Sequence, residues 1–486
     1  MAVSVNFRHG IYTSELPTPI VALTQVTAPT VAFGTAPIHL AAEPAVANTP
    51  ILCSTLAEFV NQFGWSDNFS SYTLCEVAKA HFTLYNVAPV IFVNVLDLTK
   101  HAKTSTATAE GLSTPVKLSA PIIAGSVNIT SGSEEDENLV ELTATTDFTT
   151  AFNDSGETVI TFTTAGLAKV IGDKVSISYR EVDPTAVNSS VVVGGVDIMT
   201  GDNTGLEVVD DIYPKLGVVP GTIIAPKFSS DAEVAAVMSA KAKDINGTFK
   251  AIAIADLPTA STARYTDVPR VKTSNNFADS FLVATWPKVS ISGTQYHLST
   301  QLAALMCRVD AERDNIPFKS PSNESLQCDS AVLANSKEVY LGKDLANYVN
   351  GQGVVTALNF GGWRSWGNHM SAYPTDTDPI NFIAVRRMMN WMCNTLVLNF
   401  FSRIDSPMNR VLVDAVLDSV QMWLNGLCKR GALLGGEISF LEEDNPATEL
   451  EAGNMMFRMS VGFAVPAQEI NFTVQFNPNY FNNLFE

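Results

Sequence analysis

The stretch "FKAIAIAD", residues 249–256, decides the fold, because it is an almost unbroken apolar run that ends in an aspartate. "VVPGTIIAP" (218–226) and "DSFLVATWP" (279–287) have the same character. Parallel strands that are buried on both faces have such continuous apolar sequences, whereas half-exposed strands alternate. The segments "SDAEVAAVMSAKAKD" (230–244) and "HLSTQLAALMCRVDAERD" (297–314) indicate helices. We therefore predict an α/β fold (α+β overall), with a mostly parallel sheet that carries helices on both faces.

Helices and strands also alternate nearer the N-terminus, and a segment of different composition then interrupts this pattern. "SSYTLCEVAKAHFTLYN" (70–86) predicts a helix with Ser70 or Ser71 as N-cap, and "APVIFVNVLD" (88–97) predicts a buried strand. Residues 103–205 contain no Trp, His or Cys and are rich in Thr, Ser, Val and Gly. Short alternating segments separated by turn residues predict an all-β insert there, either a small sandwich or a barrel.

The last third of the chain is predicted to be helical and then β-rich. "DTDPINFIAVRRMMN" (376–390) places Pro379 in the first turn of a helix. A second helix lies in "DSPMNRVLVDAVLDSVQMWLNGLCKRG" (405–431), with Ser406 as N-cap, Pro407 at the first position and Gly431 as its end. Its apolar residues fall on one stripe at helical spacing: Leu412, Val416, Val420, Leu424 and Leu427.

Both ends of the chain have the pattern of a strand. "VSVNF" places Val3, Val5 and Phe7 on one face, and "VPAQEINFTVQFNP" (465–478) alternates in the same way. The shared face of the second segment consists of Ile470, Phe472, Val474 and Phe476. Such strands need a sheet edge to pair with. The predicted division is an N-terminal arm (1–24), a core in two parts (25–102 and 206–375), the β insert (103–205), a helical and β domain (376–466) and a C-terminal arm (467–486).

Composition limits the partners. The 486 residues carry a formal net charge of 30 − 49 = −19, and an acidic surface repels phosphate backbones, so we expect no nucleic-acid partner. No secretory signal is expected, and the most apolar run noted, "WMCNTLVLNFF" (391–401), is too short to span a bilayer, so no stable membrane association is expected. The six cysteines contain no C-x-x-C pair, which indicates reduced thiols.

Catalytic motifs are missing from the sequence. It contains no phosphate loop, no nucleophile elbow and no H-E-x-x-H pair, and its histidines are isolated from one another. We therefore predict no catalytic, cofactor-binding or metal-binding residues. "NFGGWRSWGNHMSAY" (359–373) brings Trp363, Arg364 and Trp366 together, and a structural corner of the core is favoured there over a cation–π clamp for a ligand. "EED" (442–444) is interpreted as a solvated turn, not as a carboxylate site.

Four stretches together resemble one family. They are "HGIYTSELPTPI…TQVTAPTVAFGTAP" (9–37), "AALMCRVDAERDNIPFKSPSNE" (303–324), "LANYVNGQGVVTALNFGGWRSWGN" (345–368) and "LLGGEISFLEEDNPATELEAGNMMFRMSVGFAVPAQEINFTV" (433–474). In this order they resemble the contractile tail sheath proteins of phages and of related bacteriocin and contractile injection system particles. Asn368 and His369 depart from the pattern, because arginine often follows the W-G pair in the family. The resemblance covers residues 1–97 and 210–486 and leaves out the β insert.

The resemblance implies a structural protein and not an enzyme. It implies a helical homo-oligomer that polymerises around a tail tube protein, meets baseplate and tail terminator proteins, and contracts to drive the tube through the target cell envelope. It places the protein in a virion tail assembled in the host bacterial cytoplasm. Strand exchange between neighbouring subunits would then use the apolar faces of the two arms, namely Val3, Val5, Phe7, Ile470, Phe472, Val474 and Phe476.

Two further expectations follow from the resemblance, and three alternatives stay open. The β insert would face outward, and Lys429 and Arg430 are candidate tube contacts, although capping of a helix end explains them equally well. The alternatives are another self-assembling capsid or surface-lattice protein, an α/β enzyme of unknown substrate, and a plain α/β protein whose termini pair within its own sheet.

Overall fold

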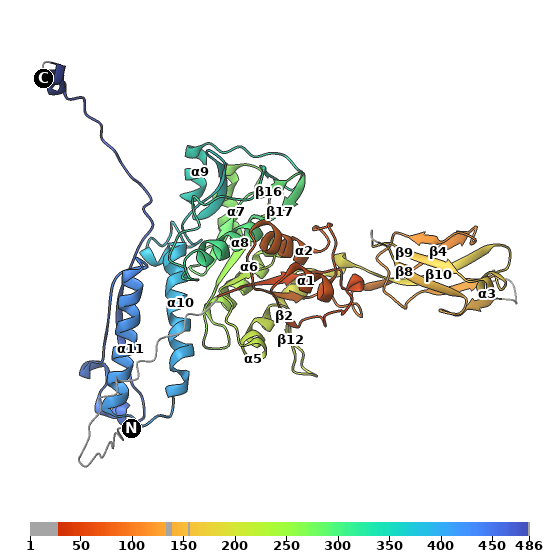
Figure 1. Ribbon diagram of the computed structural model, residues 1–486, viewed down its shortest axis with the longest axis horizontal. Helices are drawn as coiled ribbons and strands as arrows, with labels where there is room; N and C mark the ends of the chain where they lie inside the picture. Colours follow the sequence, from red (N-terminus) through yellow and green to blue (C-terminus); the bar gives the residue numbers. More distant parts are fainter. Residues whose placement is uncertain (1–27, 133–138, 154–155, 485–486) are drawn as a thin grey trace, which may run out of the picture. The chain divides into compact units, whose positions relative to one another are not determined.

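The computed structural model describes residues 28–132, 139–153 and 156–484. It divides into two compact units (Figure 1), of which the larger spans Val26–Leu398 and Val465–Glu486 and the smaller contains Asn399–Ala464. Val3, Val5 and Phe7 of the expected N-terminal arm lie outside the described residues.

The larger unit is built on an eight-stranded mixed sheet with the order β2-β3-β1-β13-β14-β15-β19-β20. The strands are β1 (Thr30–Gly34), β2 (Pro50–Cys53), β3 (Val90–Asn94), β13 (Thr222–Ile224), β14 (Ile252–Asp256), β15 (Leu282–Thr285), β19 (Val354–Asn359) and β20 (Trp363–Trp366). All pairings from β3 to β19 are parallel, whereas the outer strands β2 and β20 are antiparallel to their neighbours. The predicted mixed α/β class is confirmed.

The centre of this sheet is the core of the unit. Strands β13, β14 and β15 are buried along their whole lengths, as their continuous apolar sequences predict. Helix α6 (Ala232–Lys243) packs on β13 and β14, and α8 (Leu298–Ala311) packs on β1, β13 and β14. Further helices are α1 (Leu56–Phe63), α7 (Val268–Ser274), α9 (Lys343–Asn350) and α10 (Ile383–Phe400). One hydrophobic cluster runs through these elements.

The helix expected at 70–86 is present, but its N-cap was predicted wrongly. It consists of α2 (Thr73–Ala78) continued by a π-helical segment, η2 (Lys79–Leu84). Neither Ser70 nor Ser71 is the N-cap; Tyr72 holds that position and makes no capping bond with its side chain.

Residues that follow β1 close the N-terminus of α2 instead. The Thr73 amide donates to Oγ1 of Thr35 at 3.3 Å, and the Leu74 amide donates to the Thr35 carbonyl at 3.0 Å. The approach is so close that a Cβ on Gly34 would lie 2.1 Å from Oγ1 of Thr73, which explains the glycine. A cap supplied by a distant strand leaves no local signal in the sequence.

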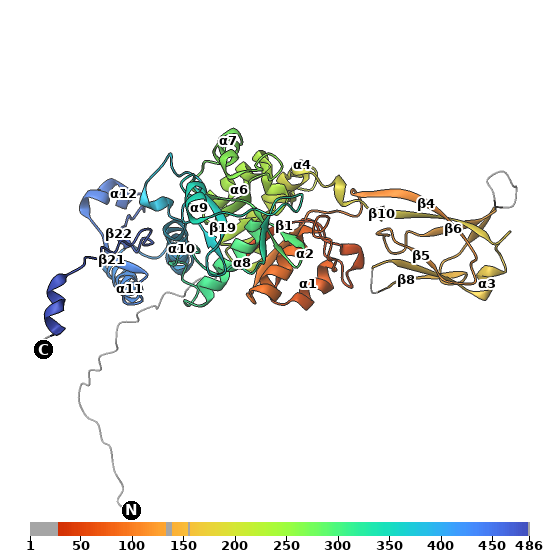
Figure 2. The same cartoon turned by 90° about the horizontal axis from the view of Figure 1, so that it is seen from above.

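The insert is a sandwich of two antiparallel sheets, visible as two layers in Figure 2. One sheet has the order β4-β10-β6-β7 and the other β5-β9-β8. The strands are β4 (Ala102–Glu110), β5 (Val116–Leu118), β6 (Asn128–Ser131), β7 (Val140–Leu142), β8 (Phe148–Phe152), β9 (Thr158–Phe162) and β10 (Lys174–Val182). Both sheets contribute to one hydrophobic cluster that is separate from the core of the α/β sheet. The insert therefore has its own core.

In the smaller unit, helix α11 (Arg410–Lys429) packs on a two-stranded antiparallel sheet of β21 (Leu433–Ser439) and β22 (Arg458–Phe463). The predicted start of the helix is wrong. Asn409, and not Ser406, is the N-cap, and its side chain accepts from the Leu412 amide at 2.9 Å. The helix ends at Lys429, and Gly431 adopts a positive φ of 75°, as a stop residue should.

Helix α11 also corrects the expectation that no apolar run reaches membrane-spanning length. Within the described residues it is the one helix that is long and apolar enough to cross a bilayer by length and composition. Leu412, Val420, Leu424 and Leu427 are nevertheless buried, and the helix packs on β21, so it buries one apolar face as an amphipathic helix does.

Candidate assembly sites

The C-terminal segment exposes an apolar face that no other part of the described residues covers. Residues 464–477 form no helix or strand, and Figure 1 shows them as an extended trace that leads to the short helix η10 (Pro478–Leu484). The alternating apolar side chains are exposed: Ile470 by 69%, Phe472 by 89%, Val474 by 92% and Phe476 by 75%. A strand-like sequence that exposes four large apolar side chains is typical of a segment that binds elsewhere. Within residues 28–132, 139–153 and 156–484, the predicted strand has no pairing partner.

One side chain anchors the start of this segment. The side-chain nitrogen of Gln468 lies 3.3 Å from Nε2 of His369. The His369 ring is stacked between Tyr373 and Phe382, with ring centroids 4.0 Å and 4.5 Å away. Burial lowers the pKa of His369, and the contact with Gln468 opposes that shift. The stacked ring of His369 thus holds the chain two residues before Ile470.

The sheet of the smaller unit has one occupied edge and one open edge. The Gln421 side chain, from α11, donates to the Gly436 carbonyl at 3.0 Å and accepts from the Ile438 amide at 3.2 Å. These two groups belong to the outer edge of β21. In the described part of the chain, the outer edge of β22 has no hydrogen bond to any other strand. An open edge can accept an added strand.

The corner around Trp363, Arg364 and Trp366 lies on the outer strand β20. Nε1 of Trp363 donates to the Asp329 carbonyl at 2.9 Å, and Nε1 of Trp366 donates to Oδ1 of Asn347 at 2.8 Å. The Arg364 guanidinium donates to the carbonyls of Asn323 at 2.8 Å and Phe360 at 3.3 Å. The guanidinium thus binds main-chain carbonyls of two neighbouring segments.

The W-G pair of the family pattern has a steric basis in this chain. Gly367 adopts a φ of 147°, and a Cβ there would lie 2.8 Å from the Cα of Val355. Only glycine fits this approach of β20 to β19.

Lys429 and Arg430 occupy the end of α11. Lys429 is the last helical residue and Arg430 the C-cap, whose amide donates to the Gly426 carbonyl at 3.2 Å. Both are exposed, and a positive charge at this end is favoured by the helix dipole. Their role in tube contact stays a prediction.

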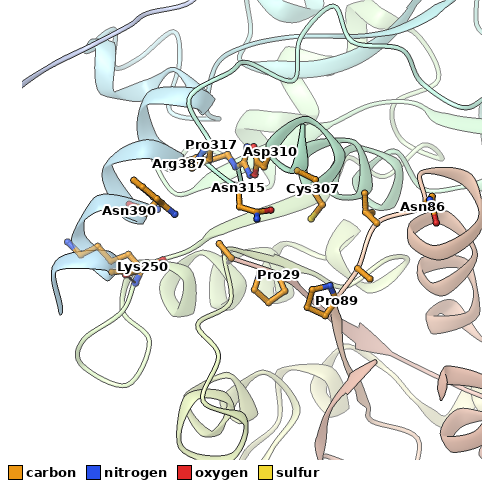
Figure 3. Close-up of a pocket in the computed structure, with 17 residues that line it drawn as sticks. Pro29, Asn86, Pro89, Lys250, Cys307, Asp310, Asn315, Pro317, Arg387 and Asn390 are labelled. Atoms are coloured by element: carbon orange, nitrogen blue, oxygen red, sulfur yellow. Dashed lines mark hydrogen bonds and ion pairs between the residues drawn. The ribbon is translucent and has the colours of Figure 1, made fainter. Parts of the chain in front are cut away.

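A cavity of about 150 Å³ near the amino ends of the parallel strands is lined by residues of α8 and α10 (Figure 3). Arg387 holds Asp310 in a buried bidentate ion pair. Asn390 donates to the Ala251 carbonyl at 2.8 Å, and Asn394 pairs with both main-chain groups of Lys250 at 2.7 and 2.9 Å. These groups join α10 to the start of β14 and so are structural.

Metal chemistry has no obvious centre in this structure. Among the described residues, no three His, Cys, Asp or Glu side chains lie close enough together to hold a metal ion. The "EED" stretch forms a 3-10 turn, η9 (Glu442–Asp444), in which Glu443 and Asp444 bind Arg458 at 3.0 and 2.5 Å.

Sequence reasoning missed the anchor and the occupied edge. Gln468 and Gln421 are ordinary polar residues in their segments, and neither has a pattern that marks a distant partner. His369 did carry a signal, because it departs from the family pattern immediately after Trp366 and Gly367.

Comparison with known proteins gives a consistent result. No family model matches the chain. The tail sheath protein of Burkholderia phage BcepMu is 27% identical over 98% of both chains. The major tail sheath protein of Serratia phage KSP20 is 25% identical over 65% of this chain and 80% of its own.

Solved structures agree on the fold. The sheath complex of the PVC extracellular contractile injection system, in its contracted state, matches 98% of this chain and 99% of its own with a TM-score of 0.58 at 13% identity. The contracted helical sheath of the anti-feeding prophage matches 97% of this chain and all of its own with a TM-score of 0.56 at 13% identity. The sequence and structure comparisons together confirm the resemblance of the motifs: this chain is a relative of the contractile tail sheath proteins along almost its whole length.

Proposed function

We propose that this chain is the structural subunit of a contractile tail sheath, which polymerises helically around a tail tube and contracts to drive the tube through a target cell envelope. The observation that carries the proposal is the exposed apolar face at 470–476, on a segment that pairs with no strand in the described part of the chain. The tail sheath protein of Burkholderia phage BcepMu, which matches over 98% of both chains, supports it.

Strand exchange between subunits explains the exposed face. The C-terminal segment of one copy adds to an open sheet edge of another, and the β22 edge offers such a site. The main-chain ladder joins the subunits, and the alternating side chains set the register. Burial of each large apolar side chain contributes about 1.5–3 kcal/mol, which is enough to keep the lattice connected while it changes shape. In this proposal Val3, Val5 and Phe7 form the corresponding face of the N-terminal arm.

Contraction needs no catalytic residue in this scheme. The energy is stored in a metastable extended lattice and is released when larger interfaces form between subunits. Around the Asp310–Arg387 cavity, the ion pair and the side-chain amide nitrogens of Asn390 and Asn394 are used in internal bonds, which fits a structural protein better than an enzyme.

The remaining expectations complete the proposal. The core (25–102 and 206–375), with helices on both faces of its sheet, carries the insert (103–205) outward, and residues 376–466 face the tube. The partners are further copies of the chain, the tail tube protein, and baseplate and tail terminator proteins. The location is the virion tail, with assembly in the host bacterial cytoplasm.

Truncation tests the proposal. The purified chain, a version that lacks residues 467–486, and a control that lacks only 478–486 are compared by negative-stain electron microscopy at high concentration. Striated hollow tubes are expected from the full chain and from the control, which keeps the alternating segment, but not from the longer truncation. Uniform monomers from all three under several salt conditions would contradict self-assembly and favour the enzyme alternative.

A further inference from the structure

A second cavity, of about 230 Å³, lies at the carboxyl ends of β14 and β15 and beside the loop after β13. Among its lining residues are Lys227, Ser230, Asp256, Thr285, Lys288 and His297. Strand β1 lies between β3 and β13. The chain therefore extends the sheet from β1 first toward β3 and later, from β13 on, in the opposite direction, and β13 is the neighbour of β14 at this cavity. Open α/β sheets bind ligands at the carboxyl ends of strands near such a switch point.

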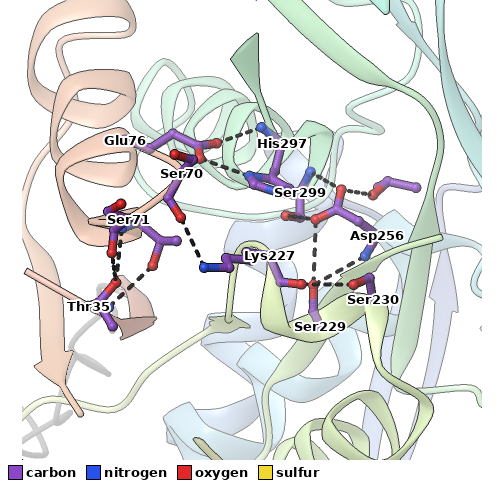
Figure 4. A network of polar contacts seen from close by, with 12 residues as sticks. Thr35, Ser70, Ser71, Glu76, Lys227, Ser229, Ser230, Asp256, His297 and Ser299 are labelled. Atoms are coloured by element: carbon purple, nitrogen blue, oxygen red, sulfur yellow. Dashed lines mark hydrogen bonds and ion pairs between the residues drawn. The ribbon is translucent and has the colours of Figure 1, made fainter. Parts of the chain in front are cut away.

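Two lysines face this cavity without an acidic partner. Nζ of Lys227 donates to the neutral Ser70 carbonyl at 3.0 Å (Figure 4). Lys288 lies in the next strand, β16 (Lys288–Ile291), and is half-buried. In the part of the chain that the structure describes, neither forms a salt bridge. Burial, and then the charge of Lys288, lower the pKa of Lys227, so the two ammonium groups repel each other.

The carboxylates nearby are already occupied. Asp256 accepts from the amide and hydroxyl of Ser299 at 3.0 and 2.5 Å and from the Thr285 hydroxyl at 2.8 Å. Glu76 accepts from the His297 amide at 2.6 Å and pairs with Nδ1 of His297 at 2.8 Å (Figure 4). Both carboxylates therefore bind the N-terminal end of α8, and within the described residues neither forms an ion pair with Lys227 or Lys288. Asp256 keeps its charge at the cavity wall, so the lysines must outweigh it for an anion to bind.

Other polar groups also line the cavity. Nδ1 of His297 is turned to Glu76, which leaves Nε2 as the other ring nitrogen of this lining residue. The turn after β14 borders the cavity at Thr259 and Ala260, and within the described residues their amides make no hydrogen bond. The volume is many times what one water requires, so a small molecule can enter.

We propose that this cavity is a binding site for a small oxyanion, such as phosphate or a small molecule with a phosphate or carboxylate group, held by the ammonium groups of Lys227 and Lys288. Lysine binds such groups as a compact charge. The bound anion removes the repulsion between the two lysines and joins the loop after β13 to strand β16. The site does not depend on sheath assembly, so the two proposals can fail separately.

The test is titration of the full chain with inorganic phosphate, by calorimetry and by thermal unfolding, with sodium chloride added to keep the ionic strength constant. We expect saturable binding and a rise in the unfolding temperature. Lys288→Met should weaken the affinity by about tenfold to hundredfold, the loss expected for one charge-assisted bond. Lys343→Met removes an exposed lysine of α9 that has no ion pair within the described residues, and it should bind phosphate as the wild type does.

Two results would overturn the proposal. One is the lack of saturable binding by phosphate and by sulfate, and the other is unchanged affinity in Lys288→Met. Lys288→Arg keeps the charge and should retain binding, which separates loss of the site from loss of folding. If Lys288→Met does not fold, Lys227→Met provides the same comparison from the other side of the cavity.

Discussion

The side-chain nitrogen of Gln468 lies 3.3 Å from Nε2 of His369, and no other side-chain bond between residues 465–477 and the rest of the described chain is present. The contact holds the C-terminal segment at one point and leaves its apolar face, which begins at Ile470, free. Because Tyr373 and Phe382 stack on both sides of the His369 ring, the anchor point itself is rigid. A segment held at its base searches a smaller volume for its binding edge than a free tail does.

Gln468→Ala should therefore weaken assembly without weakening the fold. Loss of one hydrogen bond of about 0.5–1.5 kcal/mol should raise the concentration needed for polymer formation by about twofold to tenfold. Light scattering against protein concentration measures this threshold. Asn479→Ala, in the short helix η10 that follows the alternating segment, is the matched control and should leave the threshold unchanged. An unchanged threshold in Gln468→Ala would show that the anchor does not serve assembly.

Phe472→Asp and Thr473→Asp form a matched pair on opposite faces of the C-terminal segment. Phe472 belongs to the apolar face, whereas Thr473 is on the polar face, and both are exposed in the single chain. Phe472→Asp should abolish tubes, because a buried charge costs several kcal/mol at a strand interface, and Thr473→Asp should retain them. Both variants should unfold at the wild-type temperature. Sedimentation and electron microscopy measure the assembly, and equal loss in both variants would contradict a face-specific strand.

Val461→Pro tests the open edge of β22. Gln421 binds the Gly436 carbonyl and the Ile438 amide, so these groups point away from β22. In an antiparallel ladder, the main-chain groups of two paired residues either point toward each other or both point away from each other. Gly436 points its groups away from β22, so its partner Val461 directs its amide to the outer edge of β22. Proline there removes a donor that makes no ladder bond among the described residues.

We expect Val461→Pro to fold as a monomer and to fail in assembly. Ser460→Pro is the informative comparison, because Ser460 pairs with Glu437 in the internal ladder, and the substitution should lower the unfolding temperature of the monomer itself. Normal tubes from folded Val461→Pro would exclude the β22 edge as the acceptor.

The sequence predicted the parts of this fold that depend on local pattern. Strands β13, β14 and β15 and helices α6 and α8 follow from continuous apolar runs and helical spacing. The errors lie where a distant residue decides the local structure. Thr35 closes the N-terminus of α2, so the serines that precede the helix are not needed as caps.

The candidate sites show the same division. The alternation at 470–476 was readable, because period-two apolarity is a property of the segment alone. The anchor on His369, the occupation of the β21 edge by Gln421 and the two lysines at one cavity depend on tertiary proximity, which spacing along the chain does not encode.

Lys272 gives the larger unit a predictable response to alkaline pH. Its ammonium donates to the carbonyls of Gln352 and Tyr373, both at 2.5 Å, and burial lowers the pKa of Lys272 from 10.5 to about 8. Between pH 8 and 10.5 the unfolded chain binds more protons at this residue than the folded chain, so a rise in pH through this window favours the folded state. The contribution amounts to about 3 kcal/mol at most, at 1.36 kcal/mol for each pH unit.

Lys272→Met should remove this response. Buried cysteine thiols such as Cys53, with a pKa raised to about 12, act in the opposite direction above pH 9, so only the difference between wild type and variant is informative. We expect the variant to unfold at a lower temperature than the wild type at pH 7.5, because two carbonyls lose their donor, and the gap should widen toward pH 9.5. Lys243 lies at the exposed end of α6. For Lys243→Met, the difference in unfolding temperature from the wild type should not change with pH. A constant gap for Lys272→Met from pH 7.5 to 9.5 would mean that the ammonium keeps its ordinary pKa inside the fold.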